Sequence, residues 1–261
     1  MNHRLTIQYD GTDFHGWQMQ AGGRRSVQGE LTRALSLIEG EEVVVHGAGR
    51  TDAGVHAEAQ VASVKLSKGL APDKLRDAIN GNVGRDVRVV KVEQMDDDFH
   101  ARFSARGKTY CYRVFNERVL SPFCARYAQH EARPLDISAM REAASLFIGE
   151  HDWTAFSSAQ ADVRTRVRSV TELSVSERVS ARGRGRLVEI RASADGFLRY
   201  MVRSVAGALL AAGRGEIAAA TIGHAIESGE RIILAPTAPA HGLTLLEVHY
   251  CEERRWAYFA L

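Results

Sequence analysis

Cysteine is scarce in this sequence. The three cysteines, Cys111, Cys124 and Cys251, are too few for the dense disulfide framework of a small secreted protein. No apolar run of about 18 residues occurs, so we expect no membrane-spanning helix. The first residues lead directly into a strand-like segment, residues 5–9, and do not resemble a signal peptide. Together these absences favour a protein of the reducing cytoplasm.

Motifs that bind common cofactors are also missing. A phosphate-binding loop requires Gly-Lys-Ser or Gly-Lys-Thr, and the sequence contains neither. The dinucleotide fingerprint Gly-x-Gly-x-x-Gly is matched at Gly47 and Gly49, but its third glycine position holds Asp52. A metal site could use His46, Asp52 and His56, although no His-Glu-x-x-His or paired Cys-x-x-Cys motif accompanies them. These motifs therefore favour neither a nucleotide cofactor nor a metal site.

Lysine is rare, although the chain is rich in basic residues. Five of the 34 basic residues are lysines, which leaves 29 arginines, and the net charge is only +2. Arginine binds phosphate bidentately and stacks on bases, so the excess of arginine over lysine fits a protein that binds nucleic acid. A genome rich in arginine codons would produce the same excess. Residues 99–133 hold seven basic and two acidic residues, and residues 164–191 hold eight arginines and three glutamates. Segments with this excess of basic residues are suited to binding a polyanion. The solvent-exposed faces of ordinary strands can have the same composition.

The most informative stretch is residues 47–56, which reads Gly-Ala-Gly-Arg-Thr-Asp-Ala-Gly-Val-His. Residues 41–46 before it, with three consecutive valines, predict a buried strand, and residues 59–66 after it alternate as a second strand. Glycine allows sharp bends and the close approach of a ligand. We therefore expect Asp52 on a tight loop at the end of a strand, two residues from Arg50. A plain connecting turn is the alternative.

The rest of the chain, which has 261 residues and 45% hydrophobic content, alternates between strands and helices. Further strands are predicted at residues 5–9, 87–92, 109–115, 167–175, 187–192 and 243–250. Helices are predicted at residues 26–39, 138–148, 197–212 and 216–228, and from Pro72 to a stop at Asn80 and Gly81. Phe14 and Trp17, in the intervening loop 10–25, could stack on bases or pack under the fold.

This alternation is typical of an α/β or α+β fold, and of the two we expect α+β. Two similar α/β halves, residues 1–105 and 106–261, are expected around one extended mixed, largely antiparallel sheet with a central cleft. The first half would carry the Asp52 loop, and the second would complete the cleft, which is the usual place for a ligand. Within residues 109–115, Tyr110 and Tyr112 are expected on one face and Cys111 and Arg113 on the other.

Several motifs occur in a fixed order along nearly the whole chain. They are Tyr-Asp-Gly-Thr at residues 9–12 with Gly-Trp-Gln at 16–18, Gly-Arg-Thr-Asp-Ala-Gly-Val-His at 49–56, Asp-Asp-Phe-His-Ala-Arg-Phe-Ser-Ala at 97–105, Lys-Thr-Tyr-Cys-Tyr at 108–112, Phe-Leu-Arg-Tyr-Met-Val-Arg at 197–203 and a final strand from Gly-Leu at 242–243. In this order they resemble the TruA family of tRNA pseudouridine synthases. Residues 176–186 match nothing in that pattern.

The resemblance implies a specific activity. It implies that uridine is isomerised to pseudouridine at positions 38, 39 and 40 of the tRNA anticodon stem-loop by a homodimer without cofactor or metal. Asp52 would be the essential aspartate, and Arg50 would help to displace the target base. Tyr110 would stack against the flipped uracil, and Arg203 would pair with Asp52.

The residue types suit this chemistry independently. Isomerisation breaks the glycosidic bond, turns the uracil and rejoins it through carbon, with no redox step and no energy source. A carboxylate can serve as nucleophile or base. A base inside an RNA stem must first be extruded, and a planar cation or an aromatic ring can fill the gap or hold it. Asp52 could attack the sugar, attack the uracil ring or remove a sugar proton, and all three remain open.

Two other functions share parts of this pattern. A non-catalytic RNA-binding module would use the same arginines and aromatics, with Asp52 in a structural role. A glycosidase-like or metal-dependent hydrolase needs a second carboxylate or a ligand set, and the loop offers neither. Without the resemblance, the pattern equally predicts that Tyr110 is a core residue of its strand and that Arg203 lies on a solvated helix face.

Overall fold

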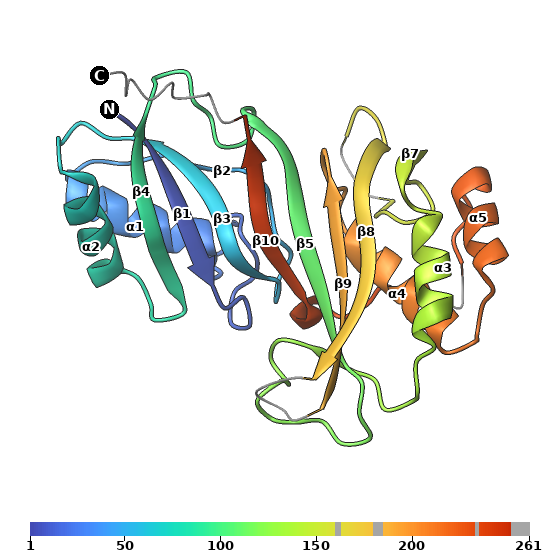
Figure 1. The fold of residues 1–261 in the computed structure, drawn as a ribbon. Helices are drawn as coiled ribbons and strands as arrows, with labels where there is room; N and C mark the ends of the chain where they lie inside the picture. Colours follow the sequence, from blue (N-terminus) through green and yellow to red (C-terminus); the bar gives the residue numbers. More distant parts are fainter. Residues whose placement is uncertain (160–162, 180–184, 233–234, 252–261) are drawn as a thin grey trace, which may run out of the picture.

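In the described part of the chain, ten strands form one sheet, which extends across the ribbon in Figure 1. This computed structural model describes residues 1–159, 163–179, 185–232 and 235–251. The strands follow the order β4-β1-β3-β10-β5-β9-β8-β7, with β2 paired to β3 and β6 to β5. They are β1 (Asn2–Tyr9), β2 (Val45–Gly47), β3 (His56–Lys65), β4 (Val87–Met95), β5 (Ala105–Phe115), β6 (Gln129–His130), β7 (Gly149–Asp152), β8 (Val167–Val179), β9 (Arg186–Ala194) and β10 (Leu243–Tyr250).

The pairing makes the sheet mixed but largely antiparallel. Among the described residues only β3 with β10 and β5 with β6 are parallel pairs. The last of the described strands, β10, lies between β3 of the first half and β5 of the second half. The predicted α+β fold with one extended mixed sheet is confirmed. The division at residue 105, which falls on the first residue of β5, stays a prediction.

The described residues form five α-helices, which pack with the sheet: α1 (Val27–Glu39), α2 (Pro72–Asn82), α3 (Ile137–Ser145), α4 (Met201–Gly213) and α5 (Ala219–Ser228). Figure 1 shows α1 and α2 at the β4 and β1 end of the sheet and α3, α4 and α5 at the β8 and β7 end. Buried side chains from both groups belong to one continuous core cluster. No helix in the described part of the chain is long and apolar enough to cross a membrane.

The helix boundaries follow local capping chemistry. The Ser26 hydroxyl accepts a hydrogen bond from the Gly29 amide at 3.2 Å and so caps the start of α1. Gly40 ends that helix in the left-handed conformation, with φ of 80°, which glycine adopts without steric cost. Pro72 lies in the first turn of α2, where its missing amide hydrogen is not needed. These three boundaries were predicted correctly.

Several other boundaries were wrong. The strand expected at residues 41–46 is reduced to β2, and Val44 is exposed, because only residues 45–47 pair with β3. The helix expected from residue 197 begins at Met201, after Tyr200 has turned the backbone to φ of 66°. α3 ends at Ser145, three residues early, and α2 continues through Gly81. Residues 180–184, within the unmatched stretch 176–186, lie outside the described residues.

Candidate active site

The loop between β2 and β3, residues 48–55, carries Asp52 and is held at both sides. The Trp17 amide donates to the Thr51 carbonyl at 3.0 Å, and the Gln60 side chain donates to the Gly49 carbonyl at 3.1 Å. The Tyr9 and Thr51 hydroxyls lie 2.8 Å apart and share a hydrogen bond. Burial raises the pKa of Tyr9 to about 12, so this hydroxyl keeps its proton at neutral pH. These hydrogen bonds hold the part of the loop that precedes Asp52 in one conformation.

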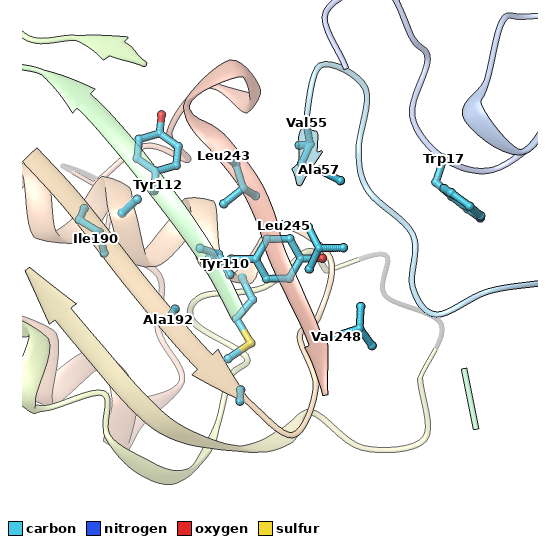
Figure 2. Packing of buried hydrophobic residues seen from close by; sticks show 14 of the residues in the cluster. Trp17, Val55, Ala57, Tyr110, Tyr112, Ile190, Ala192, Leu243, Leu245 and Val248 are labelled. Carbon is cyan, nitrogen blue, oxygen red and sulfur yellow. The ribbon is translucent and has the colours of Figure 1, made fainter. Parts of the chain in front are cut away.

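The loop 10–25 packs under the Asp52 loop and supplies part of this support. Phe14 and Trp17 are both buried, and the Trp17 ring lies where a side chain at Gly47 would have to go. Of the two roles left open for these aromatics, packing under the fold is the one the structure shows. Figure 2 shows Trp17 on the side of the core nearest Val55 and Ala57.

Gly16 is the closest point between the two loops. Its φ is 93°, and a Cβ there would lie 2.6 Å from the Thr51 carbonyl oxygen. Gly16→Ala is therefore expected to lower the free energy of unfolding by at least about 1–3 kcal/mol and to displace the Asp52 loop. Thermal unfolding and the rate of product formation measure both effects. Gly22→Ala is the matched control, because Gly22 has φ of 88° but open space around it. Equal losses of stability and of activity in Gly16→Ala and Gly22→Ala would show that the close approach to Thr51 is unimportant.

Arg203 lies beside Asp52, although 151 residues separate them in the sequence. The Arg203 Nη1 atom donates to Asp52 Oδ2 at 3.2 Å, while its Nε donates to the Ala238 carbonyl at 2.7 Å. Only 16% of the Arg203 side chain and 27% of the Asp52 side chain are exposed. The second bond fixes the guanidinium, so the ion pair orients the carboxylate while leaving it open to solvent.

A second cation, Arg199, lies at the other carboxylate oxygen. Its Nε atom is 4.0 Å from Asp52 Oδ1. The Tyr200 ring lies under both guanidinium groups, 4.8 Å from Arg199 and 5.0 Å from Arg203. Tyr200 is also the only described residue other than glycine with positive φ. Arg199 was not predicted beside Asp52, although Arg199 and Arg203, four residues apart, would share one face of the helix expected from residue 197.

Tyr110 lies on β5 and faces the core. Its ring is 7% exposed and meets Phe197 edge-on at 5.1 Å. Burial raises the pKa of Tyr110 well above its usual value, and the negative charge of Asp52 raises it further. Tyr110 therefore stays protonated at neutral pH, so it can donate a hydrogen bond but cannot act as a base. Figure 2 shows its ring beside Leu245, with the hydroxyl directed away from β5.

The predicted alternation along β5 is confirmed. Tyr110, Tyr112 and Val114 belong to the main core cluster, whereas Phe115 belongs to a second cluster with Cys124, Ala128 and Leu187. The Tyr112 hydroxyl donates to Gln129 Oε1 at 2.8 Å and to the Pro239 carbonyl at 2.9 Å. Tyr112 thus has a structural role, whereas no hydrogen bond to the Tyr110 hydroxyl is found within the described residues.

Arg50 is exposed at the edge of the same loop. Its Nε atom donates to Gln18 Oε1 at 2.9 Å, and that glutamine comes from the loop 10–25. This bond orients the stem of the side chain and leaves the terminal nitrogens of the guanidinium group accessible. Arg50 is accordingly placed to contact a ligand of the Asp52 loop.

The two histidines considered as metal ligands contact groups other than Asp52. His46 is exposed, and its ring meets His100 at 4.9 Å. His56 accepts a hydrogen bond from the Gly11 amide at 3.0 Å and lines a groove with Arg113, on the sheet face opposite Tyr110. No group of three possible metal ligands occurs among the residues that the structure describes.

Comparison with known proteins decides the family. A family model described as a tRNA pseudouridine synthase matches residues 5–104 and 143–251. The chain belongs to the tRNA pseudouridine synthase family. It is therefore an enzyme, an isomerase that acts on tRNA. The matched segments contain the Asp52 loop and Arg203, but residues 105–142, which include Tyr110, fall between them.

Relatives within the tRNA pseudouridine synthase family cover almost all of the chain. The sequence is 38% identical to tRNA pseudouridine synthase A 2 of Bacillus anthracis, over 95% of this chain and 99% of the relative. It is 39% identical to tRNA pseudouridine synthase A of Thermodesulfovibrio yellowstonii, over 96% and 100% of the two chains. The corresponding protein of Maricaulis maris is 42% identical over 95% and 97%. These matches span the region around Tyr110 as well.

Proposed function

We propose that this enzyme converts uridine to pseudouridine at positions 38, 39 and 40 of the tRNA anticodon stem-loop, with Asp52 as the essential group. The single observation that carries the proposal is the pairing of Asp52 with Arg203, next to the protonated Tyr110. A partly exposed carboxylate in a fixed orientation suits attack on a substrate atom. The same chemistry needs no cofactor or metal, and it would take place in the cytoplasm.

The reaction requires the target base to leave the RNA stem. Arg50 lies on the exposed edge of the Asp52 loop and can enter the space that the base vacates. Tyr110 then contacts the extruded uracil with its ring or its hydroxyl. The Arg203 guanidinium, bound to the Ala238 carbonyl, keeps the carboxylate directed at the nucleotide. Each residue therefore has a distinct task, and only Asp52 changes bonding in the course of the reaction.

The bond changes balance without a further reactant. The bond from N1 of uracil to C1′ of the ribose breaks, and a bond from C5 to C1′ forms. The C5 hydrogen leaves as a proton, and N1 gains one. Attack of the Asp52 carboxylate on the sugar, its attack on the uracil ring, and its removal of a sugar proton are three first steps consistent with this geometry.

The direct test maps pseudouridine on unmodified tRNA after incubation with the protein. We expect new pseudouridine at positions 38 to 40 and at no other uridine. Product elsewhere in the tRNA would contradict the assigned positions while leaving the chemistry intact. Binding without any product would instead favour a non-catalytic RNA-binding module.

Binding of tRNA should weaken steeply as the salt concentration rises. Several arginines of residues 164–191 pair with glutamates, as Arg178 does with Glu189 and Arg186 with Glu177, so they offer little charge to RNA. In residues 99–133, by contrast, three arginines are exposed and unpaired with any described carboxylate: Arg102, Arg106 and Arg118. Three phosphate contacts alone give a slope of about −2 or steeper for log K against log salt. Fluorescence titration at rising salt measures the slope, and a flat response would contradict a phosphate-binding surface.

The enzyme is also proposed to act as a homodimer. A tRNA stem-loop is larger than the neighbourhood of one Asp52 loop, so a second copy would extend the surface available to the RNA. Sedimentation at working concentration should give about twice the mass of the chain, which is 28.7 kDa. A fully active protein that sediments only as a monomer would rule the dimer out.

A further inference from the structure

Lys108 is unlike the other four lysines of the chain. Lys65, Lys68, Lys74 and Lys91 are exposed, whereas Lys108 is half-buried. Its neighbours across the sheet are Val248 on β10 and Ala194 on β9, and both are buried. The Lys108 side chain therefore crosses apolar surroundings before its ammonium group reaches solvent.

The ammonium group of Lys108 has no carboxylate partner within the described part of the chain. Burial lowers the pKa of Lys108, and the charge of Arg102 lowers it further, while Asp195 only partly opposes them. A cation in such a place is destabilised until an anion approaches it. Arginine supplies nearly all other positive charge of this protein, so a compact, flexible point charge at this position is distinctive.

Lys108 also lies beside the candidate active site. It precedes Tyr110 by two residues on β5, so the two side chains share a face and lie about 6.6 Å apart along the strand. A Cβ atom at Gly49 would be 3.0 Å from Lys108 Cε. The side chain thus passes directly beneath the start of the Asp52 loop.

We propose that Lys108 binds a phosphate group of the RNA backbone next to the target uridine, an inference that rests on the proposed function of the Asp52 site. A uridine held by Tyr110 brings its flanking phosphates near the same strand face, within reach of a four-carbon side chain. The phosphate supplies the negative charge that no described carboxylate places beside the Lys108 ammonium group. Because Gly49 has no side chain, the lysine stem has room to reach the phosphate. Lys108 is thus a substrate-binding residue that holds the RNA backbone while the base is extruded.

The test compares tRNA binding over a range of salt concentrations for four proteins: wild type, Lys108→Met, Lys108→Arg and Lys74→Met. Methionine keeps an unbranched stem in the apolar surroundings and removes the charge, so the fold should remain stable by thermal unfolding. Lys108→Met should bind roughly tenfold more weakly. The slope of log K against log salt should become shallower by about 0.7–0.9, the contribution of one phosphate. KM should rise with kcat little changed, Lys108→Arg should recover most of the slope, and Lys74→Met, an exposed lysine of α2, should match wild type.

A second measurement locates the phosphate. Two stem-loop RNAs each carry one uncharged methylphosphonate linkage, either 5′ or 3′ to the target uridine. Wild type should bind one of these two RNAs more weakly than the unmodified stem-loop. Lys108→Met should bind that RNA and the unmodified stem-loop equally well, because this variant already lacks the contact with the phosphate. If Lys108→Met did not fold, Lys108→Gln would carry the same expectation.

The results separate this inference from the function on which it rests. An unchanged salt slope in Lys108→Met, or equal effects of the neutral linkages in both proteins, would overturn the phosphate contact while wild type still formed pseudouridine. Absence of pseudouridine with wild type would overturn the proposed function, and the salt slopes would still decide whether Lys108 contacts RNA phosphate.

Discussion

Asp52→Asn is expected to fold, to bind tRNA nearly as well as wild type and to form no measurable pseudouridine. Asparagine keeps the size and shape of the side chain but removes its charge and basicity, so neither nucleophilic attack nor proton removal can proceed. Arg203 keeps its bond to the Ala238 carbonyl, which preserves the surroundings of the site. Single-turnover release of tritium from C5-labelled tRNA measures the chemical step.

Two controls make this result decisive. Asp152→Asn is the matched variant, because Asp152 accepts hydrogen bonds from Thr154 in a turn away from the site, and asparagine can keep that turn. It should retain wild-type activity. Wild type measured with a chelator should also keep its rate if no metal takes part. Substantial activity in Asp52→Asn would show that Asp52 only shapes the loop.

Tyr110→Phe should retain tRNA binding and lose turnover by about a hundredfold, the lower range for removing one hydrogen-bond donor that acts in the transition state. The phenyl ring keeps the packing against Phe197, so the change removes only the hydroxyl. Tyr110→Ala should lose more activity, and also stability of about 3–5 kcal/mol, because it leaves a cavity in the core. Pre-steady-state turnover and tRNA titration of the same preparations separate the two effects.

Tyr112→Phe is the natural comparison. Tyr112 lies on the same strand face, but its hydroxyl donates to Gln129 and to the Pro239 carbonyl. Loss of these bonds should lower the free energy of unfolding by about 1–3 kcal/mol and leave turnover near wild type. Wild-type turnover in both phenylalanine variants would make Tyr110 an ordinary core residue.

Local chemistry made much of the fold predictable. The serine cap and terminal glycine of α1, the proline of α2 and the alternation along β5 depend on residues close together in sequence. Expectations failed where neighbours distant in sequence decide the structure. Three consecutive valines predicted a strand at residues 41–46, but pairing with β3 begins only at Val45. The helix expected from residue 197 starts four residues later: Tyr200 takes a left-handed conformation, and the Arg199 carbonyl accepts a hydrogen bond from the amide of Ser158, which is distant in sequence, at 2.9 Å.

The sequence by itself determined that Asp52 lies on a glycine-rich loop between two strands, because alternation and glycine content act over a few residues. Only the tertiary structure decided what surrounds it. Insertion of β10 between β3 and β5 joins the two ends of the sheet, and α4 brings Arg203 to within 3.2 Å of a carboxylate 151 residues away. Burial likewise raised the pKa of Tyr110 and lowered the pKa of Lys108, since the desolvation of a side chain depends on every element packed around it.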